Sequence, residues 1–352
     1  MKKDLLILLV FVACSVTLTA QVKSANTYKF LNLPTSARSA AMGGSFISSG
    51  AHDLNLVADN PSVLDSTMDK NATISYINYI SNVNMGYLAY ARHFSGVGTF
   101  SAGFQFLGYG EFIRADEAGN QMGTFNAGDY ALDISYGRAL DSLFSIGASM
   151  KFIYSNYDYL NSFGLVFDVG ATYVSKSKLF TAAAVMNNMG FEIKPYFEGD
   201  RQKMPFNMQI AGSLKLAKAP LRFTVLINNM QTWDLVGNEA VDGLPTIGPD
   251  GGSIATTPDK TFTADNIFRH FIFGAEIIPS ENFFIQIAYN YLRKAELSVP
   301  GKTTLNALSM GVGFRMKRLK FSYAIASYAS KGTSHHITLS TDLKSFKRKS
   351  SN

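Results

Sequence analysis

Apolar and polar residues alternate one by one in segment after segment of this 352-residue chain. The clearest example is residues 144–152, where Phe, Ile, Ala, Met and Phe take every second position and Ser, Gly, Ser and Lys stand between them. A period of two residues is that of a β-strand with one apolar and one polar face. The chain is therefore expected to be all-β.

The apolar face of these strands must meet either a protein core or lipid. No segment after the N-terminus approaches the roughly 18 consecutive apolar residues of a membrane-spanning helix. Only 16% of the residues are charged and 13% are aromatic, yet the mean hydropathy is +0.05, so apolar residues are interleaved rather than grouped. A soluble β-sandwich or lipocalin-like barrel also alternates. Large Phe and Tyr residues in nearly every segment favour lipid, and in lipid only a closed barrel satisfies the backbone of strands.

Counting the alternating segments predicts an antiparallel transmembrane barrel of about fourteen strands, an even number as in single-chain bacterial barrels. The connections after even-numbered segments are tight, whereas those after odd-numbered ones are mostly longer, notably residues 111–128, 188–205 and 231–267. Tight turns typically lie on the periplasmic side and long loops outside. This pattern predicts an outer-membrane protein with both termini in the periplasm.

The N-terminus has the pattern of a secretory signal peptide. Lys2 and Lys3 precede an apolar run, residues 5–13, and small residues follow up to Ala20. The run is too short for a membrane anchor, and lipoprotein processing at Cys14 is a minor alternative because Phe11 stands where Leu is usual. The predicted organisation is a signal peptide (1–20), an N-terminal segment with a luminal hatch (21–70), the barrel (71–345) and a basic periplasmic tail (346–352).

Several functional classes are excluded by what a chain cleaved after Ala20 would lack. Cys14 is the only cysteine, so the mature chain would have no disulfide and no thiolate metal site. Removing Lys2, Lys3 and Asp4 leaves 30 basic and 25 acidic residues, a net +5 without a dense basic cluster before the tail, which does not indicate nucleic-acid binding. No Gly-x-Ser-x-Gly elbow accompanies the five histidines. We therefore expect neither an enzyme nor a bound cofactor or metal.

Residues 28–70 do not alternate. This segment has a stretch of small residues, two consecutive glycines and an Asn-Pro turn just before the first strand. It carries too many apolar residues for a disordered linker, although a periplasmic linker is the alternative. It is predicted to fold into the lumen as a hatch, with the motif residues Arg38, Gly43, Gly44, Asp53, Asn60 and Pro61.

The stretch 37–44, with Asp53 and residues 59–61, resembles the N-terminal hatch of the FadL-like fourteen-strand barrels. Within that superfamily the chain resembles the PorV/PorQ group of the type IX secretion system, and its PorQ branch through residues 30–38, 75–79, 109–112 and 151–155. The resemblance implies a membrane anchor that holds a surface protein, PorZ-like, in an attachment complex. It also implies contact with PorU and PorV-like components, with outer-membrane lipids and with lipopolysaccharide.

Two functions of different classes follow from these observations. The first is the anchor, whose extracellular loops hold the surface partner. The second is a FadL-type channel for hydrophobic small molecules, which the barrel and hatch suit equally well. For the anchor, the long connection 231–267 is the candidate partner-binding loop, because it has aromatic and apolar residues suited to an interface: Trp233, Leu235, Val236, Leu244 and Ile247. The alternative for Trp233 is an interfacial aromatic on the barrel rim.

Overall fold

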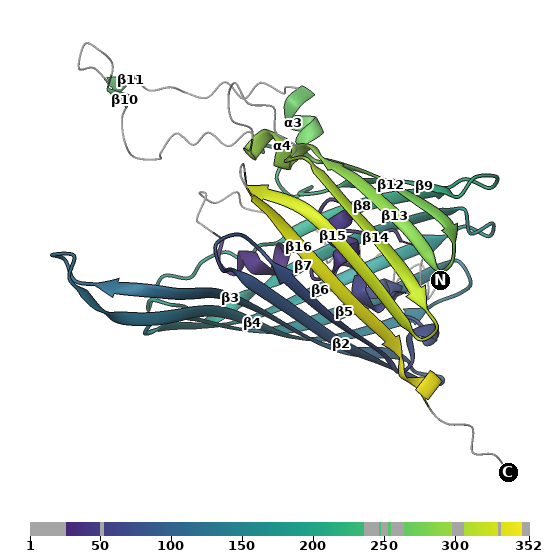
Figure 1. The fold of residues 1–352 in the computed structure, drawn as a ribbon, viewed down its shortest axis with the longest axis horizontal. Helices are drawn as coiled ribbons and strands as arrows, with labels where there is room; N and C mark the ends of the chain where they lie inside the picture. Colours follow the sequence, from purple (N-terminus) through teal and green to yellow (C-terminus); the bar gives the residue numbers. More distant parts are fainter. Residues whose placement is uncertain are drawn as a thin grey trace, which may run out of the picture.

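A computed structural model describes residues 26–49, 53–235, 246–247, 253–254, 264–297, 306–329 and 332–346. Within them, fourteen antiparallel strands form one barrel, which closes where β1 pairs with β16 (Figure 1). The predicted fold class and strand number are confirmed. The barrel strands are β1 (Asn71–Asn78), β2 (Asn84–Phe94), β3 (Gly98–Ala115), β4 (Gln121–Ala139), β5 (Phe144–Tyr157), β6 (Leu160–Val174), β7 (Phe180–Lys194), β8 (Asn207–Lys215), β9 (Leu221–Ile227), β12 (Phe271–Ser280), β13 (Phe283–Asn290), β14 (Leu308–Met316), β15 (Leu319–Ala329) and β16 (Gly332–Asp342).

The alternation assigns each strand residue to the lumen or the outer surface. In β5, Ile146 and Phe152 are exposed on the outside, whereas Ser149, Lys151 and Ile153 are buried inside. A lipid-facing row of large apolar side chains and a lumen-facing row of smaller or polar ones is the arrangement of an outer-membrane barrel. The interleaving seen in the sequence thus becomes a physical separation of two environments.

Outward aromatic rings gather at two levels of the barrel. At the tight-turn end, the ring centroids of Phe144 and Tyr173 are 4.9 Å apart. At the long-loop end, Tyr154 lies 4.9 Å from Phe163. Ten residues of β5 separate Phe144 from Tyr154, which is roughly 33 Å of strand and about 25 Å of height at a tilt near 40°. That height matches the apolar band of an outer-membrane barrel.

The tight connections lie where they were predicted, after β2, β4, β6, β8, β12 and β14. The expectation of a loop at residues 111–128 is wrong. β3 and β4 continue as a paired hairpin, with Glu111 opposite Asn126 and Ile113 opposite Thr124, and only residues 116–120 connect them. The hairpin extends well beyond the neighbouring strands in Figure 1. No lipid imposes alternation there, so the sequence pattern fades while the backbone ladder continues.

The connection after β13 also differs from expectation. Tyr291 continues the alternation of the preceding strand but begins a helix, α4 (Tyr291–Leu297), instead. The long connection before β12 contains the two-residue strands β10 (Thr246–Ile247) and β11 (Ser253–Ile254) and the helix α3 (Ala264–Arg269). Tyr291 donates a hydrogen bond to Asp265 of α3 at 2.7 Å, and Arg269 pairs with the same carboxylate. The two helices brace each other at the long-loop end.

The segment expected to form the hatch lies inside the barrel (Figure 1, purple). Its helical turns begin with residues suited to the position: the side chains of Ser36, Asp53, Asn60 and Asp65 each accept a backbone N–H at a helix start. No described helix is long and apolar enough to cross a membrane. The hatch elements are η1 (Lys29–Asn32), α2 (Ala37–Ala41), η2 (Leu54–Leu56), η3 (Pro61–Val63) and η4 (Ser66–Met68).

The two ends of the described chain lie at opposite ends of the barrel. Asn26 bridges to Lys203 in the connection after β7, at the long-loop end. The chain then runs through the lumen to β1, and the final turn η5 (Leu343–Phe346) lies at the tight-turn end, where the Leu343 N–H binds the Lys70 carbonyl. The proposed signal peptide and residues 347–352 of the basic tail lie outside the described residues.

Candidate functional site

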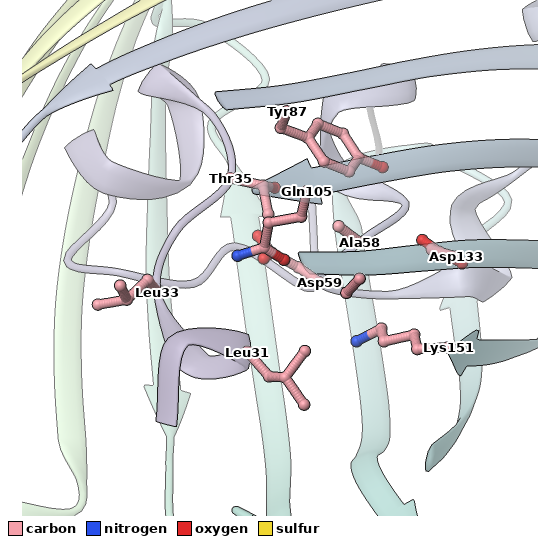
Figure 2. Close-up of a pocket in the computed structure, with 10 residues that line it drawn as sticks. Leu31, Leu33, Thr35, Ala58, Asp59, Tyr87, Gln105, Asp133 and Lys151 are labelled. Atoms are coloured by element: carbon pink, nitrogen blue, oxygen red, sulfur yellow. The ribbon is translucent and has the colours of Figure 1, made fainter. Parts of the chain in front are cut away.

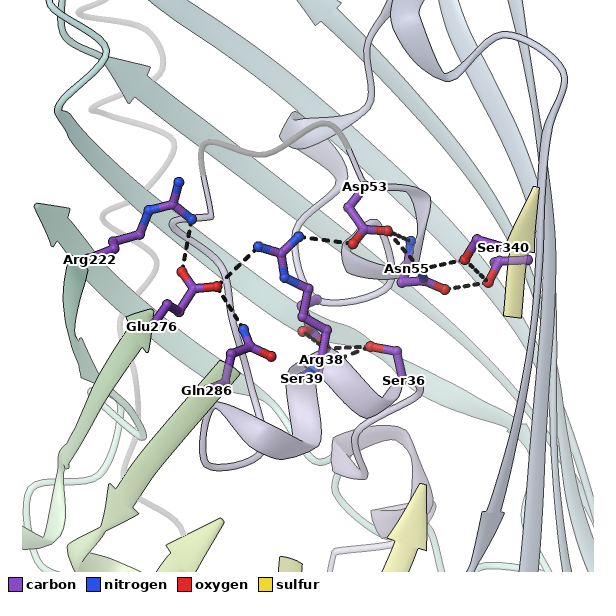
Figure 3. Close-up of polar contacts among 11 residues, drawn as sticks. Ser36, Arg38, Ser39, Asp53, Asn55, Arg222, Glu276, Gln286 and Ser340 are labelled. Atoms are coloured by element: carbon purple, nitrogen blue, oxygen red, sulfur yellow. Dashed lines mark hydrogen bonds and ion pairs between the residues drawn. The ribbon is translucent and has the colours of Figure 1, made fainter. Parts of the chain in front are cut away.

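A buried ionic network ties the hatch to the wall formed by β9, β12 and β13 (Figure 3). Arg38 of α2 donates to Asp53 of the hatch at 3.0 Å and to Glu276 of β12 at 3.1 Å. The second oxygen of Glu276 accepts from Arg222 of β9 at 2.8 Å, and Gln286 of β13 donates to the first at 2.8 Å. Glu276 is completely buried. Each of these charges therefore depends on its partners for compensation.

The network continues through neutral groups to β1 and β16. Asn55 donates to Asp53 at 2.7 Å and to Ser340 at 2.8 Å. The N–H at the start of α2, that of Ala37, binds the Thr338 hydroxyl at 2.9 Å. Arg38 is also flanked by the rings of Phe46 and Phe284, with centroid distances of 5.4 and 5.0 Å. The hatch is thus fixed across the lumen from β9 to the barrel closure.

The glycine pair of the hatch motif makes a turn that other residues adopt poorly. Gly43 and Gly44 have φ values of 89° and 118°, in the region open to glycine. The turn directs the Gly43 carbonyl toward Asn290 and Arg293, which each donate to it at 2.9 Å. A Cβ at Gly43 would also fall 2.5 Å from Ile272. Both conformation and close packing require glycine here.

Asn60 and Pro61 of the motif rest on a row of three glycines in the barrel wall. Gly147 of β5 pairs with Gly137 of β4 on one side and with Gly170 of β6 on the other. A Cβ at any of the three would come within 3.0 Å of hatch atoms, which at Gly147 are the backbone of Pro61 and Ser62. This row of luminal glycines, here called the glycine seat, lets the hatch backbone touch the wall.

A small cavity lies beside the hatch near Lys151 (Figure 2). Lys151 of β5 pairs with Asp168 of β6 at 2.7 Å, and Asp59 and Asp133 also line the cavity. Its volume is about 20 Å³, enough for about one water molecule. No group of His, Cys, Asp and Glu among the described residues could hold a metal ion. This cluster suits packing of the hatch rather than chemistry.

Next to this cavity, η1 of the hatch fills an apolar region of the lumen at the long-loop end, and Leu31 contacts both. Phe30 and Leu31 of η1 are 2% and 8% exposed and pack against inward side chains of the first strands. Barrel interiors are usually polar, so a cluster of this kind is unusual. We call the wall of this cluster the apolar chamber: Ile77, Met85, Leu107, Ala131, Ile153 and Val166.

The structure describes the two ends of the proposed partner-binding loop, residues 231–235 and 264–267, together with the short strands β10 and β11. Trp233 is 64% exposed, with its ring 5.3 Å from that of His270. The Leu235 N–H binds the Asn266 side chain of α3 at 2.9 Å. Val236 and Leu244 lie outside the described residues, and Ile247 lies in the short strand β10. Partner binding by these residues stays a prediction.

The motif residues Arg38, Gly43, Asp53, Asn60 and Pro61 all lie at contacts that hold the hatch in place, and Gly44 completes the turn. Their wall partners were not predicted as partners. Three inward glycines in consecutive strands were a usable signal, but only once the register between those strands is known.

Neither a known protein family nor a curated protein matches the sequence. Solved structures do match. A variant of the TodX monoaromatic hydrocarbon channel is 12% identical, with a TM-score of 0.50 over 88% of this chain and 99% of that one. TodX of Pseudomonas putida is 14% identical, with a TM-score of 0.49 over 91% and 98%. A FadL homologue of Pseudomonas aeruginosa is 11% identical, with a TM-score of 0.42 over 91% and 99%. The chain thus has the fold of an outer-membrane β-barrel similar to the TodX variant.

Proposed function

We propose that this protein is an outer-membrane channel for hydrophobic small molecules, gated by its hatch. The apolar chamber carries the proposal, because its cluster gathers more buried apolar side chains than the other clusters of the described residues and lies at the long-loop end of the lumen. In the structure described here, Phe30 and Leu31 cover that surface. When η1 moves away, the chamber becomes a binding surface for an apolar molecule of similar size.

The contacts of η1 suit a segment that can leave. Gln105 donates to the Phe30 carbonyl at 3.1 Å, and Asn188 donates to the Asn32 side chain at 2.8 Å. Among the described residues, no ion pair involves residues 28–33. A neutral hydrogen bond contributes only about 1 kcal/mol net. The ionic network at Arg38 holds the rest of the hatch in place while η1 exchanges with a ligand.

The proposal agrees with the similarity to the TodX variant, which is a monoaromatic hydrocarbon channel. Its test is uptake of toluene, and separately of a fluorescent long-chain fatty acid, by liposomes that contain the full-length barrel. Leu107→Gln puts a polar group in the chamber wall and should lower uptake about tenfold, since burying an unpaired amide costs about 1–3 kcal/mol. Leu226→Gln is the matched control, because Leu226 is a buried inward residue outside the chamber.

The control should keep wild-type uptake. Liposomes with wild-type protein that admit neither compound would exclude the channel, and equal losses in the two variants would exclude the chamber as its binding surface.

A second candidate is the anchor for a PorZ-like surface protein of the type IX secretion system, which the hairpin of β3 and β4 favours. Tyr130 lies at the level of the outward aromatic rings at the long-loop end, and Gln121 lies at the hairpin tip. About nine residues, which is roughly 30 Å of strand, separate the two. Ile113 and Met122 are 61% and 63% exposed on this hairpin, beyond the lipid band. Exposed apolar side chains outside lipid suit a protein interface.

The anchor proposal is tested by shortening the hairpin, residues 111–126, to a tight turn, and in a separate variant by shortening the connection 231–267. Either change should leave the barrel inserted and release the surface partner into the medium if that element holds it. A partner that stays cell-associated in both variants contradicts anchoring by these elements. Capture of PorU or PorV-like proteins with the wild-type barrel from solubilised membranes would extend the proposal to the whole complex.

A further inference from the structure

Another cavity, of about 340 Å³, lies at the long-loop end between the hatch turn and helix α4. Gly43, Gly44 and Ser45 line its hatch side, and the ends of β8, β9, β13 and β15 contribute the wall. The volume lies within the range of roughly 300–1,000 Å³ of small-molecule pockets. The apolar chamber is formed by other strands, β1 to β6, so the two are separate sites.

The lining of this pocket is rich in carboxamides. A carboxamide both donates and accepts hydrogen bonds, which suits the hydroxyl groups of a ligand. Asn207, Gln209 and Asn290 are buried and already oriented by neighbours: for example, Gln209 donates to Asn228 at 2.9 Å. Because an amide has two N–H donors and an oxygen with two lone pairs, these side chains keep hydrogen-bonding capacity beyond those contacts, which an apolar molecule would leave unused. The carboxamides that line the pocket are those of Asn32, Asn207, Gln209, Asn228, Asn229 and Asn290.

A buried guanidinium lines the same pocket. Arg293 of α4 is 7% exposed and donates to the Ser309 hydroxyl and the Gly43 carbonyl, each at 2.9 Å. Its guanidinium carbon also lies 4.3 Å from the centroid of the Tyr328 ring. These contacts use two of its five N–H groups. No described carboxylate lies within 4.0 Å of it, in contrast to Arg38, which has two.

A buried guanidinium beside which the described residues place no carboxylate points to an anion. A buried cation without an ionised partner is costly, and a guanidinium matches a carboxylate with two parallel hydrogen bonds. Glu296 is exposed at the rim of the same pocket and repels an anion at the rim. A bound ligand should therefore place its own carboxylate deep in the pocket, beside Arg293. We propose that this pocket binds a small hydroxylated carboxylate of the sugar-acid class, with its carboxylate on Arg293 and its hydroxyls on the carboxamides.

The experiment is isothermal titration calorimetry of the full-length protein in detergent micelles, with glucuronate, glucose and inorganic phosphate as probes. Glucuronate should bind at least about tenfold more tightly than glucose, because one charge-assisted contact contributes about 1.5–3 kcal/mol. It should also bind more tightly than phosphate, which lacks a sugar ring for the carboxamides. Arg293→Gln should weaken glucuronate binding by about tenfold or more.

Two further variants keep the test decisive if Arg293→Gln fails to fold. Glu296→Gln removes a like charge from the rim and should strengthen glucuronate binding about two- to fivefold, an effect that falls as salt rises. Lys294→Gln is the matched control on the same helix; its ammonium lies over the Tyr291 ring, away from the pocket, and its removal should leave the affinity unchanged. Absence of glucuronate binding would overturn the proposal, as would equal affinity for glucose or for phosphate. Because binding is measured without transport, the result is independent of the channel proposed above.

Discussion

Against β4, β5 and β6 the hatch is held by shape, whereas against β9, β12 and β13 it is held by charge. At the glycine seat, hatch backbone lies directly on wall backbone, and a single methyl group has no room. At the opposite wall, Arg38 reaches Glu276 through side chains, and the contact depends on complete charge compensation. The first wall tolerates no added volume and the second tolerates no lost partner.

The comparison bears on how a hatch could open. Shape contacts are lost over a fraction of an ångström, because dispersion falls steeply with distance. Buried charges that separate must be resolvated or left uncompensated, which costs several kcal/mol. A hatch held by both is expected to stay in the lumen while a segment without a buried charge, such as η1, moves. Variants at each wall test this division.

The largest effect is expected at the charged wall. Arg38→Met removes the partner shared by Asp53 and Glu276 and leaves both carboxylates buried, so the protein should lose about 3–5 kcal/mol of stability. The measurement is the denaturant midpoint in detergent micelles, followed by proteolysis of the hatch. Arg92→Met is the control: Arg92 pairs with Asp69 at 3.8 Å, but its side chain is 46% exposed, and such pairs contribute at most about 1 kcal/mol. Equal effects of the two variants would contradict the role given to the buried network.

The next effect is expected at the glycine seat. Gly147→Ala adds one methyl group against the Pro61 backbone, which cannot rotate away as a side chain could. Overpacking of this kind costs about 1–3 kcal/mol, and the hatch should become accessible to protease while the barrel stays folded. Gly212→Ala adds the same methyl group where the nearest atom, on the Phe180 ring, is 3.7 Å away. If protease cuts the hatch equally slowly in both variants, the steric role given to the glycine seat is contradicted.

The sequence was sufficient to predict the strands, because lipid on one side and a polar lumen on the other impose alternation at each position. The prediction from the sequence was wrong where the strands extend beyond the lipid and alternation is no longer imposed. The hairpin of β3 and β4 continues past the ring level with Phe112 stacked on Phe125, 5.3 Å apart, and its pattern was taken for a loop. At Tyr291 the alternation runs on although the strand has ended, since an aromatic residue suits the helix α4 equally well.

From the sequence, only those residues of the site that belong to the hatch could be predicted. The motif residues stand close together in the sequence, and Gly-Gly and Asn-Pro have conformational requirements that can be recognised locally. Their wall partners are far away along the chain: Arg38 and Glu276 are 238 residues apart. Which wall residue meets which hatch residue depends on barrel register and on the path of the hatch through the lumen, and neither leaves a local trace. The buried Arg293, beside which the described part of the chain places no carboxylate, was missed for the same reason.

The smallest effect is expected where the hatch leaves the lumen at the tight-turn end. Asp69 accepts the His93 N–H at 2.9 Å and pairs with Lys344 at 3.2 Å. The backbone hydrogen bond from His93, together with the cations Lys344 and Arg92, lowers the pKa of the Asp69 carboxyl below its ordinary value. A carboxyl with a lowered folded-state pKa contributes stability above its unfolded pKa of about 4 and loses it as pH falls through the folded value.

Asp69→Asn should therefore reduce stability by less than about 1 kcal/mol at pH 7, since its partners are half-exposed. The difference from wild type should shrink below about pH 4, measured as thermal midpoints from pH 7 to 3. A loss as large as that of Arg38→Met would mean that exposed charge holds the hatch as firmly as buried charge does, and the distinction between the walls would have to be abandoned.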